Sequence, residues 1–169
     1  MPAGLKATSA SVAIGFGVTE TAANTFTQGS VDLNLDPLNR EVFVVTAINL
    51  DPLPPDSIAG TNTRVNTALT TTSQTGVAGL SNANCMSVAN LYIRQNAGSV
   101  DGVSFMTIAE QPPATLDYLG IIATNDFFVQ VTGDGNTGVK SVQGKLYGYR
   151  ARATADIYAA LVQSEVLSA

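Results

Sequence analysis

Histidine and tryptophan are absent from this chain, and cysteine occurs once, at Cys85. Without an imidazole, neither a Ser-His-Asp nor a Cys-His nucleophile can form, and the usual nitrogen ligand for metals is missing. One cysteine excludes a disulfide within the chain and a metal site built on cysteines. We therefore predict that the protein is not an enzyme and has no catalytic, cofactor-binding or metal-binding residues.

Paired carboxylates, of the kind that glycosidases use, are the catalytic chemistry that remains open. The glutamates are few: Glu20, Glu41, Glu110 and Glu165. Most aspartates stand beside proline or glycine, where turn formation explains them. The segment Gly133-Asp134-Gly135-Asn136 resembles half of a calcium loop, but the bidentate glutamate that ends such a loop does not follow. We interpret residues 133–138 as a β-hairpin loop.

Charged residues are also scarce, at 12% of the chain against about 25% in average soluble proteins. A surface so poor in charge suggests that neighbouring subunits cover part of it. The net charge of −5 argues against nucleic-acid contact, because proteins that neutralise phosphates are basic. No apolar run approaches the ~20 residues that span a bilayer, so we expect no membrane contact. No secretory signal is visible, so we expect synthesis in the cytosol.

Threonine, serine and asparagine are abundant instead, at 43 residues together, with 15 glycines. Threonine favours strands, while the others favour turns. About eight strands separated by turns predict an all-β fold, a two-sheet antiparallel β-sandwich that is jelly-roll-like. The expected strands include residues 26–35, 61–73, 87–95, 103–110, 121–132 and 139–153.

The longest uninterrupted strand covers residues 40–50, between Asp36-Pro37 and Asp51-Pro52. Apolar side chains occupy both its odd and its even positions, which is typical of a strand buried on both faces. We expect it at the centre of the sandwich. The proline-rich loop at residues 51–56 that follows is either a contact loop or, as we favour, a rigid connection between the two sheets.

Two flanking segments are the predicted assembly contacts. Residues 1–24 form a flexible arm or an edge strand, residues 25–154 the sandwich domain, and residues 155–169 a short C-terminal helix or an extended tail. Thr154 is a plausible N-cap of that helix. The apolar side chains in these flanking segments that we expect to contact other subunits are Val12, Ile14, Phe16, Ile157, Tyr158, Leu161 and Val162.

Basic residues gather late in the chain, at Lys140, Lys145, Arg150 and Arg152, with no acid between Asp134 and Asp156. They form either a positive interaction patch or ordinary cross-strand pairs with acids of adjacent strands. As a patch they would meet nucleic acid or an acidic neighbouring subunit. The net charge favours the cross-strand pairs or the protein partner.

In style, residues 26–153 resemble the jelly-roll type of viral capsid and capsid-decorating proteins. The likeness lies in short strands, proline-rich loops at residues 51–56 and 111–113, and a Ser/Thr/Ala/Gly-rich arm ahead of them. It implies a structural, self-assembling subunit located in the virion, made in the host cytoplasm, whose partners are copies of itself and other virion proteins. Many such arms are basic, whereas this one holds only Lys6, which puts genome contact by the arm in doubt.

The alternative is a carbohydrate- or receptor-binding β-sandwich of a virion or cell surface. Modules of this kind expose aromatic platforms, and the face with Tyr147 and Tyr149 is the candidate. The absence of tryptophan and the fit of both tyrosines to a strand pattern favour core packing instead. No small-molecule substrate is expected in either case.

Overall fold

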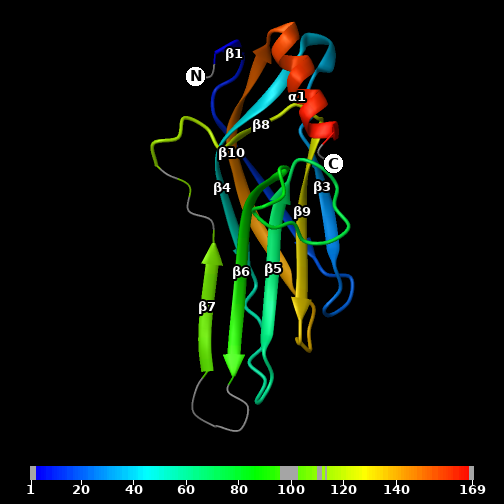
Figure 1. Cartoon of the computed structure of the whole chain (residues 1–169), viewed down its shortest axis with the longest axis vertical. Helices are drawn as coiled ribbons and strands as arrows, with labels where there is room; N and C mark the ends of the chain where they lie inside the picture. The colour runs from blue at the N-terminus through cyan, green and yellow to red at the C-terminus, as the bar shows by residue number, and fades with distance from the viewer. Residues whose placement is uncertain (1–2, 96–102, 110–111, 113, 168–169) are drawn as a thin grey trace.

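Two five-stranded antiparallel sheets make up the elongated molecule in Figure 1, a computed structural model that describes residues 3–95, 103–109, 112 and 114–167. The first sheet, sheet A, contains β1 (Leu5–Ala7), β2 (Val12–Thr19), β4 (Glu41–Pro52), β8 (Gly120–Ile122) and β10 (Ser141–Ala153). The second, sheet B, contains β3 (Thr27–Asp32), β5 (Thr63–Thr70), β6 (Cys85–Gln95), β7 (Val103–Ala109) and β9 (Asp126–Asp134). A 3-10 turn (Pro37–Asn39) and the helix α1 (Ala155–Leu167) complete the described elements.

The strand order is that of a jelly roll. With β1 and β7 set aside, sheet A runs β2-β10-β4-β8 and sheet B runs β3-β9-β5-β6. Numbered one to eight along the chain, these strands read 1-8-3-6 and 2-7-4-5, which is the pattern of one long antiparallel hairpin rolled into two sheets. The all-β, two-sheet antiparallel sandwich predicted from composition is confirmed.

The core lies between the inner faces of the two sheets. Phe43, Leu146 and Val142 from sheet A meet Leu69 and Phe127 from sheet B, and all are at most 1% exposed. Phe16 on the edge strand β2 adds an edge-to-face contact with Phe127, with ring centroids 5.6 Å apart. Such aromatic pairs add to the stabilisation from burial alone.

The central strand β4 is buried on both faces over only part of its length. Phe43 and Val45 face the core, while Val42 and Val44 lie under α1 on the outer face of sheet A. Thr46 then forms a β-bulge, because Tyr147 pairs with Ala47 and Gly148 pairs with Val45. The extra residue moves the inward-facing positions from odd to even numbers.

Ile48 and Leu50 therefore face the core, whereas Thr46, Ala47 and Asn49 are exposed. The prediction of a doubly buried strand is right for residues 42–45 and wrong beyond them. Beyond residue 45, apolar residues occur at both odd and even positions because the bulge changes which positions face the core, and not because both faces of the strand are covered.

The C-terminal segment forms the predicted helix. Ile157, Tyr158, Leu161 and Val162 pack on the outer face of sheet A, over the cluster that includes Val42 and Ala151. The buried carboxylate of Glu165 accepts hydrogen bonds from the backbone N–H groups of Ala123 and Thr124, each at 2.9 Å. Apolar contact and a buried polar anchor thus hold the helix on the sheet at the end of the molecule where β1 also lies (Figure 1).

Two connections differ from the sequence-based interpretation. Residues 121–132 are not one strand, because β8 pairs with β4 in sheet A and β9 pairs with β3 and β5 in sheet B. The hairpin loop expected at residues 133–138 is wrong as well. Residues 133 and 134 lie in β9, and residues 135–140 cross from sheet B to β10 in sheet A. The proline-rich loop after β4 does join the two sheets, as favoured. Glu110, expected to end the strand that begins at Val103, lies outside the described residues.

Gly148 marks a point where β10 approaches β4 too closely for a side chain. A Cβ atom there would collide with the carbonyl oxygen of Val44 and with the ring of the buried Phe43. We expect Gly148→Ala to destabilise the protein by about 1–3 kcal/mol, the usual cost of overpacking. Gly15→Ala on the exposed edge strand β2 is the matched control, because no atom lies within 4 Å of the added methyl. Urea unfolding followed by circular dichroism measures both changes, and equal midpoints would contradict this account.

Candidate interaction surfaces

Lys140 is not on the surface. Only 3% exposed, it donates from Nζ to the carboxylate of Asp56 and, at 3.1 Å, to the carbonyl oxygen of Pro54. It thereby ties the loop after β4 to the loop between β9 and β10. The position predicted as part of a basic patch is an internal cross-link instead.

The same end of the sandwich is held by two carboxylates that bind backbone. Besides Lys140, the Asp56 carboxylate accepts from the N–H groups of Thr137 at 2.9 Å and Gly138 at 3.2 Å. The Lys140 ammonium first, and then these N–H groups, hold the pKa of Asp56 well below its usual value. Glu20, which is buried, accepts from the backbone N–H groups of Gly133 at 2.6 Å and Lys140 at 2.7 Å.

The three glutamates that the structure describes have structural contacts. Glu20 and Glu165 bind backbone N–H groups in different loops, and Glu41 pairs with Arg150 at 3.0 Å. Arg150 is partly buried and also donates to the carbonyl oxygens of Leu33 at 2.7 Å and Asn34 at 2.9 Å. Each of these charged side chains therefore holds a loop in place.

The two remaining patch candidates, Lys145 and Arg152, are exposed. Arg152 lies directly opposite Lys6 in the pairing of β1 with β10. Together with Arg40 they line an open groove of about 470 Å³ at the start of α1. On its other side Arg152 is the register partner of Glu41 in β4, which is the cross-strand pairing with an acid that the sequence favoured, and the three cations leave the groove basic. The sequence separation between Lys6 and Arg152 hides this cluster from sequence inspection.

Most of the predicted assembly contacts cover this chain's own core. Ile14 and Phe16 pack against the inner cluster, and the four helix residues Ile157, Tyr158, Leu161 and Val162 pack against sheet A. Val12 is 44% exposed. Residues 12–19 therefore belong to the sandwich as an edge strand, and their apolar side chains are partly used within the subunit.

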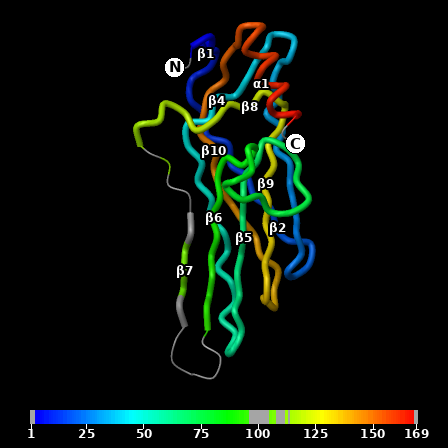
Figure 2. The backbone as a smooth tube through the Cα atoms, in the orientation of Figure 1, coloured from blue at the N-terminus to red at the C-terminus, as the bar shows by residue number. Residues whose placement is uncertain are grey.

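An exposed apolar edge lies elsewhere, on β7. This strand is the last of sheet B and pairs with β6 (Figure 2). Phe105 and Met106 are adjacent, so they point to opposite faces, yet they are 56% and 46% exposed. Both faces of β7 are thus open at apolar side chains, at the border of the sheet.

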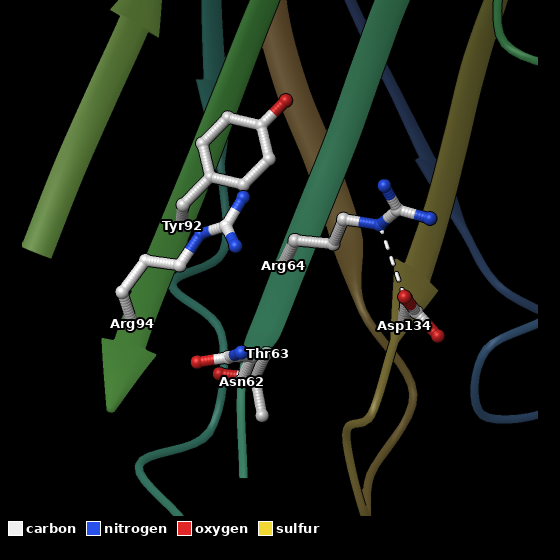
Figure 3. Close-up of a pocket in the computed structure, with 6 residues that line it drawn as sticks. All are labelled: Asn62, Thr63, Arg64, Tyr92, Arg94 and Asp134. Carbon is white, nitrogen blue, oxygen red and sulfur yellow. Dashed lines mark ion pairs between the residues drawn. The ribbon is translucent and has the colours of Figure 1, made fainter. Parts of the chain in front are cut away.

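The outer face of sheet B carries a polar hollow of about 150 Å³ (Figure 3). Tyr92, Arg64 and Asp134 lie in one row across β6, β5 and β9, because each is the register partner of the next. Arg64 Nε pairs with Asp134 Oδ2 at 3.1 Å, and both side chains are at least half exposed. Arg94 and Asn62 complete the rim on the same side.

The tyrosine face proposed for a sugar platform is divided. Tyr149 packs in the cluster under α1, and Tyr147 is 37% exposed. Within the described part of the chain, no three of His, Cys, Asp or Glu lie close enough together to hold a metal ion. No helix among those residues has the length and apolar character to cross a membrane.

Comparison with known proteins does not assign this chain to a family. No protein-family model and no curated protein matches the sequence. A solved structure from Desmodium yellow mottle tymovirus is similar over 86% of this chain and 90% of its own, with 14% identity and a TM-score of 0.34. The jelly-roll assignment above rests on strand order and not on this likeness.

The Lys140–Asp56 contact predicts a stability change. In Asp56→Asn, a buried ammonium loses its counter-ion, and we expect a loss of about 2–3 kcal/mol, below the ~3–5 of fully buried pairs because Asp56 is 31% exposed. Since folding lowers the pKa of Asp56, its contribution is present above about pH 4 and disappears as the pH falls further. As the pH is lowered from 7 to 2, the urea midpoint of the unmodified protein should therefore fall more than that of Asp56→Asn.

Asp134→Asn is the matched control, because its pair with Arg64 is exposed and should contribute little. An equal loss in both variants would show that the Lys140–Asp56 contact is not the cause.

Proposed function

We propose that this protein is a structural subunit that self-assembles, as a shell or decorating component of a virion. Viral capsid domains are among the proteins that use the jelly roll. The observation that carries the proposal is β7, a border strand with exposed apolar side chains on both faces. Copies of this chain are the proposed partners, together with other virion proteins.

An edge of this kind is unusual in a protein that stays monomeric. Natural proteins protect border strands with charges, bulges or covering elements, because a bare strand pairs with other chains. Phe105 and Met106 provide apolar side chains where such protection is expected. A neighbouring subunit that covers β7 removes this surface from water and satisfies its outer backbone groups.

Charge supports the same proposal. The chain carries a net charge of −5, and only 12% of its residues are charged. Its basic groove, formed by Lys6, Arg40 and Arg152, offers an acidic neighbour a complementary contact. With Lys140 and Arg150 used inside the subunit, few cations remain for a polyanion. The residues therefore favour protein partners over nucleic acid.

A carbohydrate- or receptor-binding module is the second candidate. Lectin domains also use the jelly roll. The observation that favours it is the polar hollow around Arg64, Tyr92 and Arg94, and not the tyrosines of β10. The hollow and β7 offer different side chains, and they adjoin where Met106 of β7 pairs with Tyr92 of β6.

Assembly can be tested with one substitution. We expect the purified protein to form large, regular particles by light scattering and electron microscopy. Phe105→Glu places a charge on the exposed edge, and it should leave subunits or small oligomers with an unchanged circular dichroism spectrum. Leu80→Glu is the matched control, since Leu80 is 58% exposed in the loop between β5 and β6 and belongs to no proposed assembly contact.

A monodisperse monomer at high concentration in all salt conditions would contradict self-assembly. Normal particles from Phe105→Glu would instead remove β7 from the contact. Deleting residues 1–24 is a poorer test, because the deletion removes β1 and β2 from sheet A.

A further inference from the structure

We propose that the hollow on the outer face of sheet B is a binding site for an acidic sugar, a single pyranose unit that bears a carboxylate. The residues that carry it are Arg64, Arg94, Tyr92 and Asn62 (Figure 3). The inference goes beyond self-assembly and does not depend on it. It assigns a ligand class to a surface that neither the core nor the proposed contact edge uses.

The hollow has an excess of unused hydrogen-bond donors. Arg64 is engaged with Asp134 through Nε, which leaves its terminal Nη groups available. Arg94 is exposed and makes no ion pair with any residue that the structure describes. The side-chain Oδ1 of Asn62 accepts a hydrogen bond from the backbone N–H of Gln95 at 2.9 Å, so the side-chain NH₂ of Asn62 remains for a ligand.

The donors lie on one face of two adjacent strands. Arg64 is the register partner of Tyr92, and Arg94 follows Tyr92 by two residues, so all three side chains emerge on the same side of the sheet. Figure 3 shows the Arg94 guanidinium turned toward Tyr92, and that of Arg64 turned toward Asp134. With two guanidinium groups and one carboxylate in its lining, the hollow carries a local positive charge, although the net charge of the chain is −5.

This chemistry selects the ligand. A planar guanidinium matches a carboxylate with two parallel hydrogen bonds, which is the geometry arginine favours over lysine. The tyrosine adds an apolar ring with a polar end, suited to a ligand that has both ring C–H groups and hydroxyls. Asp134 supplies the acceptor that a sugar hydroxyl needs. A carboxylate on a hydroxyl-rich ring uses all of these groups.

Size and surroundings restrict the ligand further. At about 150 Å³ the hollow is smaller than the ~300–1,000 Å³ of pockets for drug-sized molecules, so it holds about one ring. The loop between β5 and β6 covers the upper part of the same face, where Ala78 packs on Ala68 and Val88 (Figure 2). A long extended polyanion would meet this loop, whereas a terminal sugar would not.

The test is an NMR titration of ¹⁵N-labelled protein with the methyl glycosides of glucuronic acid and N-acetylneuraminic acid. We expect saturable shifts centred on residues 62–64 and 92–94 for at least one acidic sugar, and none for methyl glucoside. Arg94→Ala should weaken binding at least about tenfold, the effect of losing a charge-assisted hydrogen-bond pair. Lys145→Ala is the matched control, because Lys145 is an exposed cation on sheet A and its loss should leave the affinity unchanged.

Three results would overturn the proposal: no saturable binding of either acidic sugar, equal binding of methyl glucoside, or unchanged affinity in Arg94→Ala. The same titration is carried out with acetate and with a glutamate-containing peptide. If either binds as tightly as the acidic sugars, the hollow recognises a bare carboxylate, such as one from a neighbouring protein, and the sugar assignment fails. The Phe105→Glu variant serves as the host for these titrations if the unmodified protein assembles, so that a failure of assembly and a failure of binding are observed separately.

Discussion

The burial of β4 between two covers is the constraint on which the rest of the structure depends. Phe43 and Val45 face the core between the sheets, while Val42 and Val44 lie beneath α1. The helix is therefore part of the fold, because without it Val42 and Val44 would lose the cover on the outer face of sheet A. Glu165 fixes the position of α1 by binding the loop between β8 and β9, so the last turn of the helix also positions the edge of sheet A.

At the opposite end of the sandwich, buried charged side chains add to the apolar core. Lys140, Asp56 and Glu20 join loops that connect sheet A with sheet B, and they do so largely through backbone groups. The chain has few charged residues, and several of them are thus used inside the molecule. The surfaces that remain for partners are correspondingly distinct: an apolar border at β7, a basic groove beside α1, and a donor-rich hollow on sheet B.

Sequence reasoning was most successful for local structure. Of the two alternatives for residues 155–169, a helix or an extended tail, the helix is the one that forms, and its apolar residues follow helical spacing. Most strands were found because proline, glycine and asparagine bound them. It failed where distant partners decide the outcome. Residues 133–138 have the composition of a hairpin loop, yet β9 and β10 belong to different sheets. Lys140 resembles a surface cation in the sequence, but in the structure it is buried and donates to the carboxylate of Asp56. The basic groove and the hollow were missed for the same reason.

The sequence by itself determined the class of fold, and it excluded histidine chemistry and a disulfide within the chain. These conclusions rest on composition and short-range pattern alone, namely on alternating apolar residues, turn-forming residues and the absence of histidine. Only the tertiary structure decided which charges face solvent, how β4 changes parity at Thr46, and which residues meet across the sheets. The physical reason is that register and strand order arise from long-range packing, since a shift of one residue exchanges the buried and exposed faces of a strand. Interaction surfaces are set by such pairings, so they appear only once the chain is folded.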